Sequence, residues 1–145
     1  MSIPRGYHSA AILLADGSVL MGGDKPGQWK SGETTQHERY FPSYYNLPRP
    51  QITAAPGNIN YGVAFNVTTP SPASIAEVVL VRPGAVTHGF NMSQRLIECT
   101  ITGTTATDVQ VKVPANKNIA PPGPYLLFIL TASRIPSVAR WVRLT

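Results

Sequence analysis

Two histidines and a tyrosine are the side chains in this sequence best suited to chemistry. Tyr7 and His8 adjoin just before a predicted strand, and His88 lies in a loop between two later predicted strands. Imidazole nitrogens suit Cu(II), and a phenol can add an oxygen ligand to a tetragonal site. The same residues also fit plainer roles, such as an aromatic anchor beside a strand and a hydrogen-bonded loop side chain. Their spacing alone leaves both interpretations open.

Other chemistries have less support. The single cysteine, Cys99, excludes an internal disulfide, and the alternation around it predicts a buried structural thiol rather than a nucleophile. His37 lies in a polar loop and is predicted to be a surface residue. We find no glycine-rich phosphate loop, no Gly-x-Ser-x-Gly elbow and no evident acid–base pair among the scattered carboxylates.

The length and charge of the chain limit the classes of protein to which it can belong. The chain has 145 residues, the usual size of one domain, with 14 Pro and 12 Gly that predict many turns. Its net charge of +5 is spread along the chain, so no nucleic-acid interface is predicted. No apolar run approaches the roughly 20 residues of a membrane span. The first residues lack the apolar stretch of a signal peptide, so the sequence predicts either an intracellular protein or a leader that is lost or left out.

A hydrophobic period of two predicts an all-β fold. Residues 9–15 and 18–21 are expected to form a hairpin around Asp16 and Gly17, followed by a loop to about Glu38. Two strands alone are not a stable sheet, so this hairpin must dock on the rest of the chain, pair with a second copy or meet something absent. From residue 48 onward, a two-sheet antiparallel sandwich is expected, with strands at 51–55, 62–69, 75–82, 94–100, 107–113, 124–130 and 138–144.

Several stretches, in order, carry a resemblance to a known family. They are Arg5-Gly-Tyr7-His8-Ser9 with Asp16-Gly17 and Gly22-Gly23, Glu38-Arg-Tyr40-Phe-Pro42-Ser-Tyr44, Arg49-Pro50, Val81-Arg-Pro-Gly84-Ala-Val-Thr87-His88-Gly-Phe-Asn91-Met-Ser-Gln94-Arg95, Pro121-Pro-Gly123-Pro-Tyr125 and Pro136-Ser137-Val138-Ala139. In these the chain resembles the C-terminal end of the galactose oxidase and glyoxal oxidase family of copper-radical oxidases. The blocks span nearly the whole sequence.

The resemblance implies a fold and a partial copper site. Residues 1–47 would be a hairpin and connector like the end of the last propeller blade, and residues 48–145 an early-set, immunoglobulin-like β-sandwich. Tyr7 matches the axial tyrosine that accepts the substrate proton, while His8 and His88 match the two histidine ligands. The family's fourth ligand, a tyrosine cross-linked to cysteine, lies upstream of this motif, and Cys99 cannot replace its cysteine. We therefore expect weak copper binding and no Tyr–Cys radical cofactor.

Three functions follow as expectations. In the first, the chain is a free-standing or truncated oxidase-like domain without activity alone. In the second, it is a subunit that completes an oxidase site with a separate propeller chain, for alcohol or aldehyde oxidation by O2. In the third, it binds carbohydrate or protein. The last rests on the aromatic residues Trp29, Tyr40, Tyr44 and Tyr45. Self-association through the hairpin is a further expectation. The family is usually secreted, which leaves the location of this chain open.

Overall fold

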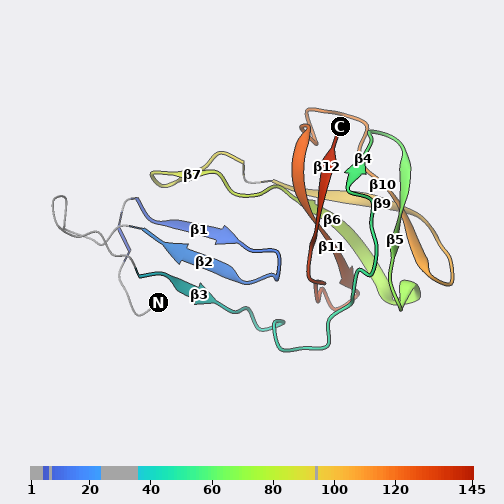
Figure 1. The fold of residues 1–145 in the computed structure, drawn as a ribbon, viewed down its shortest axis with the longest axis horizontal. Helices are drawn as coiled ribbons and strands as arrows, with labels where there is room; N and C mark the ends of the chain where they lie inside the picture. Colours follow the sequence, from blue (N-terminus) through green and yellow to red (C-terminus); the bar gives the residue numbers. More distant parts are fainter. Residues whose placement is uncertain (1–4, 7, 24–35, 94) are drawn as a thin grey trace.

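A computed structural model describes residues 5–6, 8–23, 36–93 and 95–145. The chain forms a small sheet at its N-terminal end and a larger β-sandwich that holds the C-terminus (Figure 1). Within the described residues there is no α-helix, only the short 3-10 turn η1 (Pro72–Ser74). No helix in the described part is long and apolar enough to cross a bilayer. The all-β prediction is confirmed.

The small sheet has three strands rather than the two predicted. Strand β1 (Ala10–Leu13) pairs with β2 (Val19–Gly22) as expected, and β2 also pairs with β3 (Glu38–Tyr40), which the sequence had assigned to the end of a loop. Three residues of mixed polarity give too short a pattern to detect. Strand β3 forms because the edge of β2 is available for pairing, and a sequence pattern does not show this.

The turn between β1 and β2 also differs from the expected two-residue form. Gly17 N donates to Leu14 O at 2.9 Å, and Leu14 N donates to Ser18 O at 2.9 Å, so three residues lie between the paired positions. Of the Asp-Gly pair only Gly17 has a positive φ, at 83°. This is the three-residue hairpin with a left-handed glycine. Asp16 lies within this turn, and its carboxylate accepts side-chain and backbone hydrogen bonds.

The sandwich is built from seven strands in one continuous sheet. Its spatial order is β4-β12-β11-β6-β9-β10-β5. The long strand β9 (Leu96–Thr104) pairs through its first half with β6 and through its second half with β10, and so joins the two layers. The remaining bounds are β4 Asn58–Ile59, β5 Ala64–Thr68, β6 Ile75–Val81, β10 Asp108–Lys112, β11 Gly123–Thr131 and β12 Arg140–Leu144.

Two details of the predicted sandwich were wrong. Residues 51–55 form no strand beyond an isolated bridge from Ala54 to Thr68, and the edge position is taken instead by β4. Strand β4 runs parallel to β12, whereas all the other pairs in this sheet are antiparallel. Pro50 and Pro56 flank residues 51–55, and because proline cannot donate to a ladder they limit strand pairing on both sides of this stretch.

The sandwich core lies between the two layers. Val109, Val111 and Val113 alternate with polar residues, and these three side chains are at most 2% exposed. Val63, within the range predicted for a strand at 62–69, lies outside β5 and is 55% exposed. Strand β11 is apolar on both faces, and the structure places it between β12 and β6 at the centre of its layer.

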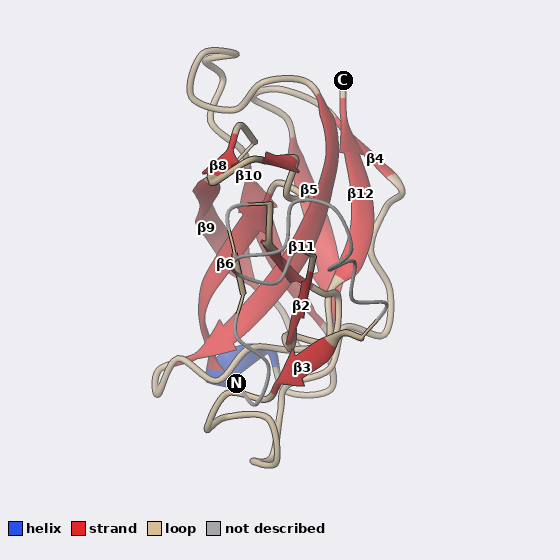
Figure 2. Cartoon of the chain, turned by 90° about the vertical axis from the view of Figure 1, so that its left-hand side faces the viewer, coloured by secondary structure: helices blue, strands red, loops and turns tan. Residues whose placement is uncertain are grey.

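The second face of β11 receives the small sheet. Val79, Leu126, Phe128 and Ala139 form a separate buried cluster against which Leu13 and Ala15 pack. Ala139 N also donates to Ala15 O at 2.8 Å. Seen from its own side, the small sheet lies in front of the sandwich strands (Figure 2). Of the arrangements expected for the hairpin, the structure shows docking on the sandwich.

Asp16 anchors the turn at this contact. Its carboxylate accepts hydrogen bonds from Ser18 N at 3.0 Å, Ser18 Oγ at 2.7 Å and Tyr45 Oη at 3.0 Å, and it pairs with Arg39. Burial alone would raise the pKa of Asp16, but the bonds from Ser18 and Tyr45 and the charge of Arg39 together lower it below the ordinary value of 3.8. The charged form is therefore favoured by folding.

Acid should accordingly weaken this contact. Because the pKa of Asp16 is lower in the folded than in the unfolded chain, its contribution is complete above about pH 3.8 and is lost as the pH falls below that value. Urea unfolding at pH 7, 4 and 3 should show a steeper acid loss for wild type than for Asp16→Asn. The pKa of Asp108 is also lowered, by hydrogen bonds from Thr68 and Thr107, but Asp108 is present in both proteins, so the difference between them isolates Asp16. Parallel acid slopes would contradict the prediction.

Candidate metal site

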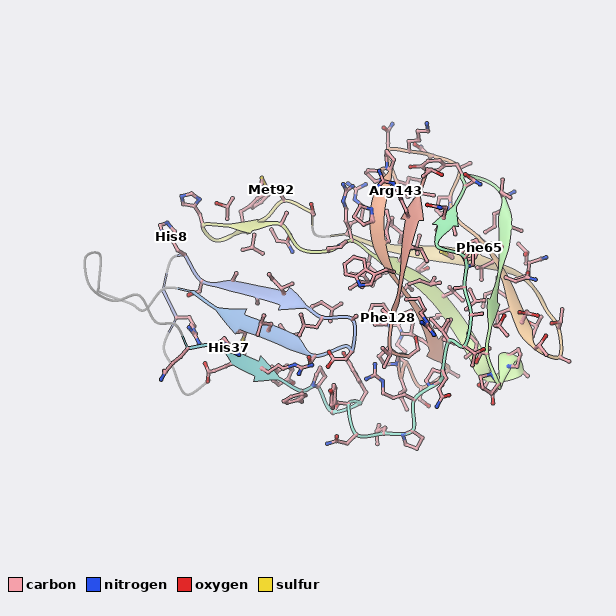
Figure 3. The ribbon with its side chains drawn as sticks, in the orientation of Figure 1. His8, His37, Phe65, Met92, Phe128 and Arg143 are labelled. Carbon is pink, nitrogen blue, oxygen red and sulfur yellow. The ribbon has the colours of Figure 1, made fainter. Side chains whose placement is uncertain are left out.

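The structure brings His8 and His88 together. Their ring centroids are 4.9 Å apart and the rings meet edge to face, at 84°. Figure 3 shows His8 at the far end of the small sheet from the sandwich. Both histidine side chains are exposed. Tyr7, the third predicted ligand, lies outside the described residues.

His88 is delivered by a short arm that the sequence analysis had assigned to a loop. Strands β7 (Val86–Thr87) and β8 (Phe90–Asn91) pair antiparallel, which leaves His88 and Gly89 as the turn at the tip. Strand β7 of this arm contacts β1, and Figure 1 shows the two side by side. His88 therefore reaches the N-terminal segment because the arm lies along the first strand of the small sheet.

The backbone at His88 is strained. Its φ is 56°, in the left-handed region where glycine and asparagine are favoured and other residues cost on the order of 1–3 kcal/mol. The base of the arm is fixed by Asn91, whose Oδ1 accepts from Ala85 N at 3.0 Å and from Ser93 N at 3.2 Å. A histidine at a position better suited to glycine is consistent with a role for its side chain.

A neighbouring hydroxyl engages one nitrogen of His88. Thr87 Oγ1 lies 2.9 Å from His88 Nδ1, a hydrogen-bond distance whose donor depends on the tautomer. Ligating histidines commonly use one ring nitrogen for a fixed outer partner and the other for the metal. On this geometry a metal would bind His88 through Nε2.

The segment that carries His8 is held from two sides. Arg5 Nη1 donates to Gly23 O at 3.1 Å and to Gln36 O at 3.2 Å, and Arg5 also pairs with Glu38. Gly23 has a φ of 104°, and a Cβ there would lie 2.6 Å from the carbonyl oxygen of His8. The chain thus requires glycine at this crossing, and Arg5 closes the end of the small sheet around His8.

The histidine pair fits two adjacent ligands of one metal ion. A metal–imidazole bond is about 2.0–2.1 Å and the ring centre lies roughly 1 Å further, so two imidazoles at right angles place their centres about 4.4 Å apart, and opposite ones about 6 Å. The observed 4.9 Å lies between these values, nearer the first. Within the described residues, no three His, Cys, Asp or Glu side chains form a metal-sized group.

The other candidate residues lie elsewhere. His37 is exposed beside β3, as predicted (Figure 3). Cys99 faces the sandwich core from β9, 8% exposed, and burial raises the pKa of its thiol to about 12. The prediction of an inert buried thiol is confirmed. In this position Cys99 cannot reach the histidine pair.

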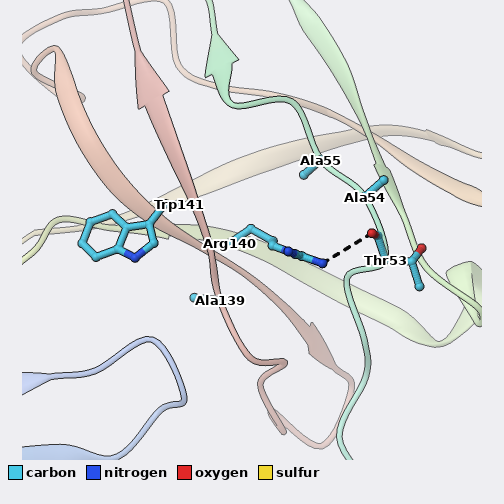
Figure 4. A pocket seen from close by; sticks show the side chains of 6 residues that line it. All are labelled: Thr53, Ala54, Ala55, Ala139, Arg140 and Trp141. Carbon is cyan, nitrogen blue, oxygen red and sulfur yellow. Dashed lines mark hydrogen bonds between the residues drawn. The ribbon is translucent and has the colours of Figure 1, made fainter.

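An open cleft of about 470 Å³ lies on the sandwich (Figure 4) and shares no residue with the histidine pair. Its lining includes Arg140, which donates to Ile52 O, and Trp141, whose side chain is exposed. Two of the aromatic residues that suggested sugar binding, Tyr44 and Tyr45, are instead bonded to the β1–β2 turn. Tyr40 is exposed and Trp29 lies outside the described residues. Carbohydrate binding stays a prediction.

The structure is an immunoglobulin-like β-sandwich with a docked three-stranded sheet, and the rings of His8 and His88 meet at the end of that sheet. Residues 49–144 match the galactose oxidase-like, early set domain, and the chain belongs to this family. Over 99% of its length it is 35% identical to a galactose oxidase of Gibberella zeae and 34% identical to the aldehyde oxidase GLOX of Vitis pseudoreticulata. It spans 22% and 30% of those proteins, respectively.

A solved structure supports the same assignment. It is described as a novel fungal alcohol oxidase of the AA5 family in complex with copper, and it matches the whole chain with a TM-score of 0.84 at 27% identity. The chain covers 32% of that structure. The match includes the small sheet as well as the sandwich, so the docked position of the sheet is one that a copper-containing relative also has.

Proposed function

We propose that this chain forms one part of a copper site of the galactose oxidase type, with Tyr7, His8 and His88 as ligands, and that it is inactive as an oxidase by itself. The 4.9 Å approach of the two imidazoles supports this proposal most directly. The copper-containing structural relative supplies the identity of the metal. Binding is weak, because two neutral imidazoles and one phenol leave the site short of a ligand.

The chain's own residues divide the work at such a site. His8 and His88 would hold the metal from two chain segments, and Thr87 contacts Nδ1 of His88. Tyr7, as the resemblance implies, would accept the proton from a substrate hydroxyl. Copper would supply one-electron redox chemistry, whereas oxidation of an alcohol to an aldehyde removes two electrons and two protons. The second electron requires a cross-linked Tyr–Cys pair, and the only cysteine of this chain is buried in β9.

Copper titration and a peroxide assay test the proposal together. Calorimetry should give one Cu(II) per chain with weak affinity, and the copper-loaded chain should form no peroxide from galactose or glyoxal in air. Tyr7→Phe should lower the affinity and remove any phenolate-to-copper absorption band. Peroxide formation by the purified chain would refute the inactivity, and binding that survives loss of both histidines would refute the site.

A second candidate is a subunit that completes an oxidase site together with a propeller chain. Trp141 and Leu96 are 58% and 62% exposed. Trp141 pairs with Leu126, which belongs to the cluster beneath the small sheet, and Leu96 pairs with Val81, which packs against that cluster. Paired residues share a face, so these side chains flank the docked sheet and extend its apolar surface. Exposed apolar area of this kind favours a protein partner.

Mixing tests this second candidate. The copper-loaded chain is combined with the remaining part of the Gibberella zeae galactose oxidase, from which the region matched here has been removed. Peroxide formed from galactose only in the mixture, and not with Trp141→Asp, would support a shared site. A mixture that stays inactive and elutes as two separate species would exclude it for this partner, and a dimer of the chain alone would instead support self-association.

A further inference from the structure

Arg49 joins the turn of the small sheet to the sandwich. Its Nη1 donates to Asp16 O at 2.6 Å, its Nε to Pro136 O at 2.7 Å and its Nη2 to Ser137 O at 2.6 Å. The first acceptor belongs to the β1–β2 turn, and the other two belong to the loop before β12. One guanidinium thus bonds to both parts of the molecule at once, and bonds that involve a charged donor are roughly twice as strong as neutral ones.

The surroundings of Arg49 fix its position. The rings of Tyr44 and Tyr45 lie 5.8 Å and 5.7 Å from its guanidinium carbon, within range of cation–π attraction. Tyr44 Oη also donates to Gly17 O at 2.6 Å. A Cβ at Gly17 would lie 3.1 Å from Arg49 Nη2, so the turn approaches the guanidinium as closely as a glycine allows.

This contact is at the opposite end of β1 from His8. At about 3.3 Å per residue, the chain from the turn to His8 spans roughly 20 Å. A rotation of the small sheet by about 10° around the turn would therefore move His8 by some 3–4 Å, whereas metal–ligand distances hold to within about 0.2 Å. Such a movement is comparable with the 4.9 Å that separates the two rings. A small rotation of the sheet at the turn therefore gives a large displacement of His8 relative to His88.

We propose that Arg49 is a positioning residue: by fixing the turn of the small sheet to the sandwich, it keeps the ring of His8 beside that of His88. The inference deepens the proposed function, on which its consequence for copper rests. The ring geometry itself can be measured without metal. The ring contact in metal-free protein therefore tests the role of Arg49, and copper affinity separately tests the proposed metal.

The test compares Arg49→Met with Arg140→Met. Methionine keeps an apolar stem and removes the donors. Arg140 is the matched control because it also donates to backbone carbonyls, those of Ile52 and Thr53, but joins only parts of the sandwich. In metal-free protein we expect the nuclear Overhauser effect between the His8 and His88 ring protons to disappear in Arg49→Met and to persist in Arg140→Met. Copper affinity should fall at least about tenfold in Arg49→Met and stay within twofold in the control.

A disulfide provides the rescue. Ala139 N donates to Ala15 O at 2.8 Å, so Ala15→Cys with Ala139→Cys places two thiols on neighbouring backbone segments, one from each part of the molecule. In the Arg49→Met background, the oxidised disulfide should restore the ring contact, and reduction should abolish it again. If Arg49→Met folds poorly without the disulfide, the oxidised form still allows the ring contact to be measured in a folded protein.

The outcomes separate the two proposals. A ring contact that survives in Arg49→Met, or that the disulfide cannot restore, overturns the positioning role whatever happens to copper. If wild type shows the ring contact and its loss in Arg49→Met but binds no Cu(II), the positioning role stands and the proposed function fails. If copper binds wild type and Arg49→Met equally, the consequence for the metal is wrong while the proposed function remains.

Discussion

His88→Gly should bind Cu(II) at least about 100-fold more weakly than wild type while folding at least as stably. Loss of an outer hydrogen-bond partner of a ligand already costs roughly 10–100-fold in metal affinity, and loss of a ligating imidazole must cost more. The fold should not suffer, because His88 has a φ of 56° and glycine adopts that conformation without strain. Affinity and stability should therefore change in opposite directions, which no general loosening of the structure would produce.

The measurement is a Cu(II) titration together with a thermal melt in metal-free buffer. His37→Ala is the control, since His37 is an exposed histidine apart from the pair. It should leave both the affinity and the melting temperature unchanged. An unchanged affinity in His88→Gly would show that His88 is a turn residue retained without a metal role, and equal losses in both variants would indicate nonspecific binding of copper to surface histidines.

The sequence predicted the sandwich well where one face is buried. Val109 and Val111 alternate with polar residues and are buried on one face, and residues 125–130 of β11 form an apolar run that is buried on both faces. The elements that the sequence did not predict are the short ones. Strands β3, β4, β7 and β8 are two or three residues long, too short for a period of two to appear. They exist because a neighbouring strand offers an edge, which is a property of the assembled fold.

The site followed a similar division. Residue type singled out His8 and His88, and the family resemblance related them to one metal, but their spacing in sequence could not show that they meet. Their approach depends on the docking of the small sheet, through Arg49, and on the arm that carries His88. Thr87 and Arg5 were not identified as site residues. A threonine beside a histidine, and an arginine two residues before Tyr7, are common in sequences. Their roles appear only in the structure, which shows the contacts of Thr87 with His88 and of Arg5 with Gly23 and Gln36.

The two faces of β11 should respond differently to the same substitution. Leu127 is fully buried in the sandwich core, and Leu126, its neighbour, is 2% exposed in the cluster beneath the small sheet. Truncation of a buried leucine to alanine costs roughly 2–5 kcal/mol. Leu127→Ala should therefore lower the melting temperature by about 5–15 °C in a chain of this size. Copper affinity below the melting transition should be unchanged, because the cavity lies on the far side of the strand from the small sheet.

Leu126→Ala should lose stability too, but it should also release the small sheet. The cavity opens where Leu13 and Ala15 pack, so amide hydrogen exchange in β1 should accelerate and copper affinity should fall even well below the melting temperature. Leu47→Ala, at a side chain 48% exposed, should change the free energy of unfolding by no more than about 0.5 kcal/mol. If Leu126→Ala and Leu127→Ala prove equal in copper affinity as well as in stability, the small sheet is not held by this cluster, and the contact through Arg49 must position His8 without it.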